Sequence, residues 1–402
     1  MSDPSRGNDS EVFGGAARAS QYIEEETIST PPRVVPTEPA MVEVPTGLAA
    51  AGPEPVAEVV HVPPVSAAPV GDESGTGAAR ATPDSASVLF GGVAGTLPVE
   101  DPAKATTGFR GTLARMGFPV GPGPEEVETR RRDAARAAAE TTVRQATWTR
   151  AVSILVNNPK GGTGKTPTSL LLGGVLASIR GGSTAIMEVS DDPGALGYRA
   201  EGHPSLGLGE LVRDIEQITT AGRLHGYTAP QTSFADVIGS TGRRERLTGD
   251  AVVAVSSVID EFYGIRVMDS GNVTTSAAFQ AAVSVSDVLV IPVMNAGDSV
   301  LEAIQLLEEL RAAGGQPKRL ADNAIAVRLT DGRPENAAVS AEVERLLFDA
   351  GVASLHEIPY DAHIAERQQI TLAKLTPATR DAFVAVAAAV VTSLKSTVST
   401  AH

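Results

Sequence analysis

A glycine-rich loop with two lysines is the part of this chain best suited to chemistry. Residues 158–169 read Asn-Pro-Lys-Gly-Gly-Thr-Gly-Lys-Thr-Pro-Thr-Ser and lie between an apolar run at 151–156 and a leucine-rich, amphipathic segment at 169–179. Glycine reaches backbone conformations that other residues avoid, so successive N–H groups can turn toward one anion. A helix after the loop would add the positive end of its dipole. The pattern therefore predicts a phosphate site at the start of a helix.

The residue types inside the loop suggest their roles. Lys165 can bring a positive charge to the β- and γ-phosphates of a nucleotide, and the Thr166 hydroxyl can ligate Mg²⁺. Pro159 stands where a Walker A loop normally begins with glycine, and Pro167 removes one backbone N–H. The residues of this loop predicted to bind nucleotide are Lys160, Gly161, Gly162, Thr163, Gly164, Lys165, Thr166 and Pro167.

The early lysine, Lys160, gives the loop the form K-G-G-T-G-K-T, which resembles the deviant Walker A loop of the ParA/MinD family of P-loop ATPases. The resemblance covers roughly residues 150–395. It implies that ATP and Mg²⁺ are the cofactors and that ATP binding produces a homodimer. In such a dimer Lys160 of each subunit would complete the partner's site as a catalytic residue, and slow hydrolysis would reset the state. A glycine-rich turn that only joins a strand to a helix is the alternative.

An acidic turn, Ser-Asp-Asp-Pro-Gly at 190–194, follows an apolar strand predicted at 183–189. Ligands of open α/β sheets bind at the carboxyl ends of strands, so we expect this turn to face the nucleotide. In the family that the loop resembles, an aspartate two residues after a strand-ending acid positions the attacking water. If Glu188 is that acid, Ser190 takes the aspartate's place, and the catalytic candidates Asp191 and Asp192 fall one and two residues late. The departure puts the hydrolysis rate in doubt, and a turn selected only for its geometry is the alternative.

A second strand delivers an aspartate at Gly-Ile-Arg-Val-Met-Asp-Ser-Gly, residues 264–271. Asp269 resembles the Walker B aspartate, which holds Mg²⁺ through water in P-loop ATPases. Thr166 and Asp269 are therefore the predicted metal residues. Gly271 would let the following loop swing toward the γ-phosphate.

The adenine contacts are expected near the end of the chain. The resemblance implies that a proline-containing turn after the last strand wraps the base, which points to Pro359 and Asp361. It also implies that an Asn or Arg closing the preceding strand region helps to read the base, and Arg328 occupies that region. A plain surface arginine is an equal alternative for Arg328.

From residue 150 the chain alternates strand-like and helix-like segments, which predicts an α/β fold. We expect the three-layer fold of P-loop NTPases, with a mostly parallel twisted sheet. Further strands are predicted at 287–293, 323–329 and 352–358, and further helices at 299–313, 335–350 and 377–394. The last helix lacks the basic face of a membrane-targeting helix and should pack on the sheet.

The first third of the chain has a different composition. Of the 27 prolines, 17 fall within residues 1–124, among Ala, Gly, Glu, Ser and Thr. Such a segment buries too little apolar surface to offset its ordering entropy. We predict a disordered tail at 1–105, a connector at 106–149 with a basic, Ala-rich helix at 125–147, and an ATPase domain at 150–402. No run of 18 apolar residues and no basic-then-apolar leader occurs, so we expect no transmembrane segment. The absence of cysteine fits a cytoplasmic protein.

Charge limits the choice of partners. The net charge of −15 argues against strong nucleic-acid binding by the whole chain, although it permits a local basic face. The arginines near residue 130 either form a solvated helix face or contact DNA, acidic lipid or a regulatory partner.

Three functions remain open. The first is a partition-type ATPase that positions or segregates cargo, binds DNA nonspecifically at the nucleoid and is activated by a partner protein through the tail or the basic helix. The second is a MinD-like ATPase serving a secretion or membrane-associated machine, because residues 108–124 also resemble the connector of MinD-like ATPases of type VII secretion. The third is an ATP-dependent dimerising scaffold with weak or no hydrolysis.

Overall fold

A computed structural model describes residues 104–399 of the 402-residue chain. The described residues belong to one unit. The predicted disordered tail at 1–105 lies almost entirely outside the described residues.

The described residues form an eight-stranded sheet in the order β3-β4-β2-β5-β1-β6-β7-β8. All neighbouring strands run parallel except the short pair β3 and β4, which is antiparallel. The mostly parallel α/β sheet predicted from the sequence is thus confirmed. The strands are β1 (Val152–Val156), β2 (Thr184–Val189), β3 (Ala229–Pro230), β4 (Ala235–Ile238), β5 (Ile265–Ser270), β6 (Val288–Met294), β7 (Ile325–Leu329) and β8 (Ser354–Ile358).

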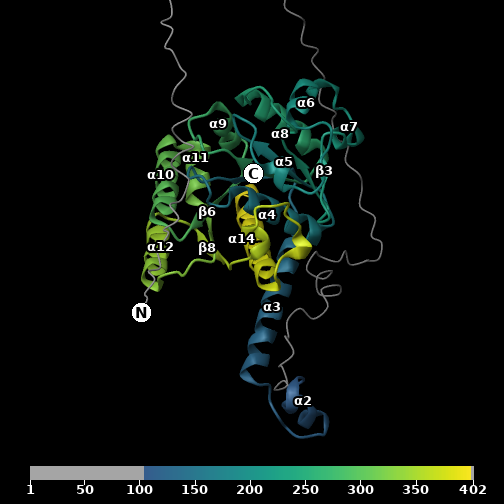
Figure 1. The fold of residues 1–402 in the computed structure, drawn as a ribbon, viewed down its shortest axis with the longest axis vertical. Coiled ribbons are helices and arrows are strands. Elements are labelled where there is room, and N and C mark those ends of the chain that lie inside the picture. Colours follow the sequence, from purple (N-terminus) through teal and green to yellow (C-terminus); the bar gives the residue numbers. More distant parts are fainter. Residues whose placement is uncertain (1–103, 400–402) are drawn as a thin grey trace, which may run out of the picture. The chain divides into compact units, whose positions relative to one another are not determined.

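Helices cover both faces of the sheet (Figure 1). Alternate strand residues enter two separate cores, so Ile154 of β1 packs on one side and its neighbour Leu155 on the other. One core is shared with α4 (Lys165–Arg180), α14 (Pro377–Ser399) and the end of α3 (Pro124–Gln145). The other is shared with α6 (Leu208–Arg213), α8 (Gly249–Phe262), α9 (Ala277–Ser284), α10 (Gly297–Ala313), α11 (Gly315–Asp322) and α12 (Ala337–Asp349).

Helix α14 is, within residues 104–399, the one helix long and apolar enough to cross a membrane by length and composition alone. Its side chains Phe383, Val386 and Val390 are fully buried in the core that it shares with α4. This burial accounts for its apolar character, because the face that packs on a parallel sheet must be apolar. The helix packs on the sheet as the sequence predicts.

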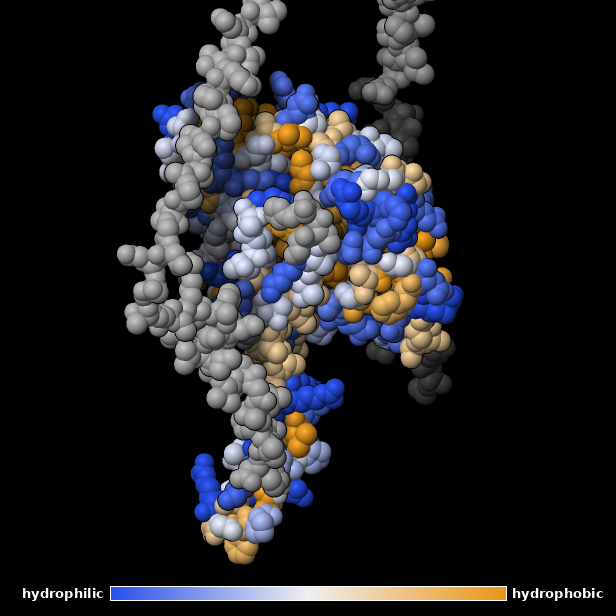
Figure 2. Space-filling model, turned by 180° about the vertical axis from the view of Figure 1, so that it is seen from behind, coloured by the Kyte–Doolittle hydropathy of each residue, from blue (hydrophilic) through white to orange (hydrophobic). Residues whose placement is uncertain are grey.

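The predicted basic helix is α3, and its last turn joins the core. Val143 and Ala146 are buried there, and the Arg180 guanidinium donates hydrogen bonds to both of their carbonyl groups. Arg180 also lies over the Trp148 ring, 4.7 Å from its centroid. At the end of α3 far from the sheet lies α2 (Gly108–Arg115), where Figure 2 shows hydrophobic side chains at the surface. The exposed apolar residues of this region are Phe109, Met116, Phe118 and Val127.

Residues 196–262 contain several elements for which the sequence made no prediction. Besides α6, α8, β3 and β4, they are α5 (Leu196–Arg199), η2 (Ile215–Gln217) and α7 (Ala221–His225). Two short elements also follow β8, namely α13 (Ala362–Ala365) and η3 (Leu372–Lys374). Most of these elements are too short to show a hydrophobic period.

Candidate nucleotide-binding site

A cavity of about 760 Å³ lies at the carboxyl ends of the parallel strands. The whole glycine-rich loop at 160–167 lines it, together with Asp269, Pro359 and Asp361. Three predicted site residues, Asp191, Asp192 and Arg328, are not among the residues that line it. The cavity therefore brings together the predicted phosphate and metal residues. It leaves out the catalytic candidates of the turn after β2 and one of the predicted base contacts.

The backbone of the loop needs glycine at two positions. Gly162 and Gly164 have φ angles of +82° and +92°, a region that favours glycine. A Cβ atom on Gly164 would also lie 2.8 Å from Leu329 Cδ2. Gly164 directly precedes α4, so the loop feeds into the positive end of that helix.

Lys165 is held inward by three oxygen atoms. Its Nζ donates to the carbonyl of Asn158 at 2.7 Å, to the carbonyl of Lys160 at 3.0 Å and to Asn272 Oδ1 at 2.5 Å. Burial lowers the pKa of Lys165 to about 8, although the negative charge of Asp269 acts in the opposite direction. The ammonium group thus lies beside the loop with neutral oxygens as its hydrogen-bond partners, a setting suited to an incoming anion.

Asp269 lies at the end of β5 and binds two hydroxyl groups from the first turns of α4. Thr166 Oγ1 donates to Asp269 Oδ2 at 2.7 Å, and Ser169 Oγ donates to Asp269 Oδ1 at 3.0 Å. Burial raises the pKa of Asp269 to about 6, and the hydroxyl hydrogen bonds only partly offset this rise. A carboxylate and a hydroxyl are oxygen donors that Mg²⁺ prefers, and a nearby cation would favour the ionised form of Asp269. These residues fit a magnesium ion, and Ser169 is a neighbour that the sequence did not suggest for it.

Lys160 makes an ion pair within its own chain. Its Nζ lies 2.8 Å from Asp298 Oδ2, in the first turn of α10. Both side chains are well exposed to solvent and both residues line the cavity.

The turn after β2 places Glu188 and Ser190 at the cavity. Asp192 is exposed and lies 3.7 Å from Arg246 Nε. Glu188 instead forms a buried ion pair with Arg244, whose Nη2 is 2.9 Å from Glu188 Oε1. Sequence patterns gave no indication of Arg244, because its loop at 239–248 has no hydrophobic period and no known motif.

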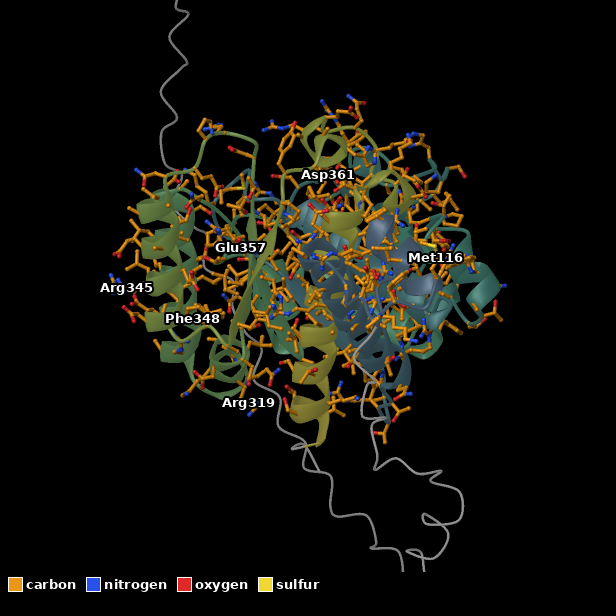
Figure 3. The ribbon with its side chains drawn as sticks, turned by 90° about the horizontal axis from the view of Figure 1, so that it is seen from below. Met116, Arg319, Arg345, Phe348, Glu357 and Asp361 are labelled. Carbon is orange, nitrogen blue, oxygen red and sulfur yellow. The ribbon has the colours of Figure 1, made fainter. Side chains whose placement is uncertain are left out.

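The predicted base contacts have different settings. Arg328 is buried on β7, where it pairs with Glu335 at 3.5 Å and with Glu357, its register neighbour on β8. Asp361 borders the cavity, but its two oxygens accept hydrogen bonds from the backbone N–H groups of His363 and Thr376. Figure 3 marks Glu357 on β8 and Asp361 just after it. The structure thus gives Arg328 and the Asp361 carboxylate partners within the protein.

Most arginines of α3 also have partners within the protein. Four of them form ion pairs with acidic side chains on the same helix, mostly one turn away. These pairs are Arg130–Glu126, Arg132–Glu128, Arg136–Asp133 and Arg144–Glu140. Paired charges of this kind are typical of a solvated helix face.

Comparisons with known proteins give neighbours in structure. No protein-family model matches the sequence, and no curated protein matches it significantly. Among solved structures, the chain is similar to a ParA family ATPase from Chlorobium tepidum, at 16% identity and a TM-score of 0.48, over 60% of this chain and 99% of that one. It is also similar to a variant of McdA from Cyanothece in complex with ATP, at 17% identity and a TM-score of 0.44, over 60% and 97% of the two chains. MinD from Aquifex aeolicus follows at 17% identity and a TM-score of 0.44, over 58% and 94%. These structural neighbours are a ParA family ATPase, McdA and MinD.

Proposed function

We propose that this chain is a ParA/MinD-like P-loop ATPase that binds ATP with Mg²⁺ in the 760 Å³ cavity. One observation carries the proposal. The hydroxyls of Thr166 and Ser169 are bound to the Asp269 carboxylate beside the glycine-rich loop and its buried Lys165. A phosphate cradle and an oxygen-donor metal site thus meet at one helix start, as the binding of a metal-complexed nucleoside triphosphate requires.

Each part of the site would contribute a separate function. The N–H groups of the loop and the start of α4 would hold the phosphates, and Lys165 would neutralise their charge. Thr166 and Asp269 would hold Mg²⁺, which neutralises charge that develops on the phosphates. Pro359 borders the cavity on the β8 side and would contact the base.

We further propose that the nucleotide controls a dimer. Lys160 is half-exposed at the rim of the cavity, so a second copy of the chain can approach it. ATP and ADP would differ in their contacts to the γ-phosphate, and only such a difference can shift a monomer–dimer equilibrium. In this proposal the ATP-bound dimer positions or segregates a cargo, with DNA and an activating protein as partners.

The residues of the turn after β2 support a second candidate function. Ser190 borders the cavity where an aspartate was expected, and neither Asp191 nor Asp192 lines it. An ATP-dependent dimerising scaffold with weak hydrolysis fits this arrangement.

Calorimetry on the full chain tests nucleotide binding. ATP should release heat in millimolar Mg²⁺, and Lys165→Ala should remove it. Lys318→Ala, an exposed lysine of α11 that pairs with Asp322, is the matched control and should bind as the unchanged protein does. No binding by the unchanged protein would overturn the proposal. Phosphate release measured with and without DNA then separates the two candidates, because a scaffold releases little phosphate under either condition.

A further inference from the structure

Arg244 is a buried cation outside the cavity. It lies in the loop between β4 and α8, and only 5% of its side chain is exposed. Its guanidinium donates to three consecutive carbonyl groups of the turn after β2, at 2.7 Å to Ser190, 2.7 Å to Asp191 and 3.2 Å to Asp192. Arg244 therefore fixes, by hydrogen bonds, the backbone of the turn that brings Ser190 to the cavity.

The same guanidinium orients the acid at the end of β2. Glu188 Oε1 accepts hydrogen bonds from Arg244 Nη2 at 2.9 Å, from Ser240 Oγ at 2.6 Å and from the Gly194 backbone N–H at 3.0 Å. Glu188 Oε2 is buried and has no hydrogen-bond partner among the described residues, while Glu188 itself lines the cavity. One carboxylate oxygen of Glu188 is thus saturated with hydrogen bonds, and the other is buried without a partner among the described residues.

The turn is confined from its other side as well. A Cβ atom on Gly271 would lie 3.1 Å from Ser190 Cβ, and the Gly271 N–H donates to the carbonyl of Val189 at 2.8 Å. In addition, the Leu247 N–H donates to the carbonyl of Asp191 at 3.2 Å. The turn after β2 is therefore held between the loop after β5 and the loop that carries Arg244.

Only a guanidinium can make this set of contacts. It offers five N–H donors in a planar fork, whereas a lysine ammonium is a single point of charge. Removal of one partner from a buried ion pair leaves the other charge uncompensated, which is strongly unfavourable. The contacts to the turn and to Glu188 thus depend on the same side chain.

We propose that Arg244 is a positioning residue for ATP hydrolysis. Through the backbone at 190–192 and through Glu188, it holds the turn after β2 in the arrangement that hydrolysis requires, without contributing to nucleotide binding. This inference rests on the proposed ATPase function. It predicts that the loop at 239–248 controls turnover from outside the nucleotide cavity.

The test compares Arg244→Ala and Arg244→Lys with the unchanged full-length protein. Both variants should keep a Kd for ATP within about threefold, since Arg244 does not line the cavity, while single-turnover phosphate release should slow at least about tenfold. Millimolar guanidinium ion should restore part of the rate of Arg244→Ala and none of that of Arg244→Lys. Arg246→Ala is the matched control, because this neighbouring arginine is exposed and lies only loosely near Asp192.

Hydrogen exchange gives a second readout that needs no turnover. Amides of residues 190–195 should exchange faster in the Arg244 variants, and amides of the glycine-rich loop should exchange as before. If Arg244→Ala does not fold, as judged by thermal unfolding, Arg244→Lys carries the test. Unchanged phosphate release in folded Arg244 variants would overturn the role of Arg244 in hydrolysis, and unchanged exchange at 190–195 would show that it does not hold the turn. Failure of the unchanged protein to bind ATP would instead remove the proposed function, and the exchange measurement would still decide whether Arg244 holds the turn.

Discussion

Lys160 Nζ and Asp298 Oδ2 lie 2.8 Å apart within one chain. The pair joins the glycine-rich loop to the first turn of α10, and the hydrogen bond to Asp298 raises the pKa of Lys160. The proposed dimer requires this same lysine to reach the partner's nucleotide. Dimerisation would therefore begin with the loss of an ion pair in each subunit.

Removal of the acid in this pair should favour the dimer. We expect Asp298→Asn to tighten ATP-dependent dimerisation about two- to fivefold, since exposed ion pairs contribute little. Lys160→Ala should abolish the dimer while ATP binding remains measurable. Light scattering over a range of protein concentrations measures both effects, with Asp349→Asn on α12 as the control. Weaker dimerisation of Asp298→Asn would contradict the competition between the two contacts.

The stability of the nucleotide-free protein should depend on Asp269. Burial raises the pKa of this carboxyl from 3.8 in the unfolded chain to about 6 in the fold. Between these values the folded protein binds the proton more tightly, so ionisation of Asp269 lowers the free energy of unfolding as the pH rises from about 4 to 6. Relative to Asp269→Asn, the unchanged protein should lose up to about 3 kcal/mol over this range. Urea unfolding at several pH values measures this difference. If the free energy of unfolding changes with pH in the same way in both proteins, ionisation of the buried Asp269 does not destabilise the fold.

Nucleotide affinity in the presence of Mg²⁺ should rise with pH over the range in which the stability of the nucleotide-free protein falls. Below pH 6 Asp269 takes up its proton, and a neutral carboxyl is a poor partner for a hydrated cation. We expect the gain in ATP affinity that Mg²⁺ provides to fall about tenfold for each pH unit below 6. Calorimetry with and without Mg²⁺ measures that gain. In Asp269→Asn the gain should be small at every pH, and a large gain in this variant would exclude Asp269 as a metal residue.

Two glycines of the same loop, Gly164 and Gly161, test whether the loop needs a positive φ angle. Gly164→Ala should weaken ATP binding at least about tenfold and destabilise the fold by about 1–3 kcal/mol, because of its positive φ and the contact with Leu329. At Gly161 a Cβ atom would meet only Asn272 Nδ2, at 3.6 Å, so Gly161→Ala should leave stability nearly unchanged. Thermal unfolding and calorimetry compare the two variants. Equal losses of stability would mean that backbone strain is not the cause.

Helix α14 should be a structural part of the ATPase domain. Phe383→Ala removes a fully buried ring from the core shared with α4 and should cost about 3–5 kcal/mol. Phe348→Ala on α12, labelled in Figure 3, is the control, because this residue is about half-exposed. Urea unfolding monitored by circular dichroism measures both changes. A small effect of Phe383→Ala would mean that α14 does not stabilise the core.

The sequence predicted the sheet and the phosphate site because their signals are local. Strands such as β6 are continuous apolar runs, and the glycine-rich loop carries its backbone conformations and donors within a few residues. Asp269 could be singled out as a candidate metal residue because it lies at the end of such a strand. Each of these features could be identified without knowledge of what packs against it.

The missed features depend on contacts between distant segments. Arg244 meets Glu188 across 56 residues, and Asn272 meets Lys165 across 107 residues. The short strands β3 and β4 have too few residues to show a period. Arg328 occupies a predicted strand, but only the register with β8 shows that it faces Glu357.

The hydrogen bond from Lys165 Nζ to Asn272 Oδ1 links the glycine-rich loop to the segment after β5. In the proposed ATP complex, a phosphate that binds the Lys165 ammonium would compete with the side-chain oxygen of Asn272 and with the carbonyls of Asn158 and Lys160. Loss of that hydrogen bond would free Asn272, in the segment that follows β5, as the nucleotide binds. Nucleotide binding would thereby be transmitted to the loop after β5 through the exchange of a single hydrogen-bond partner of Lys165.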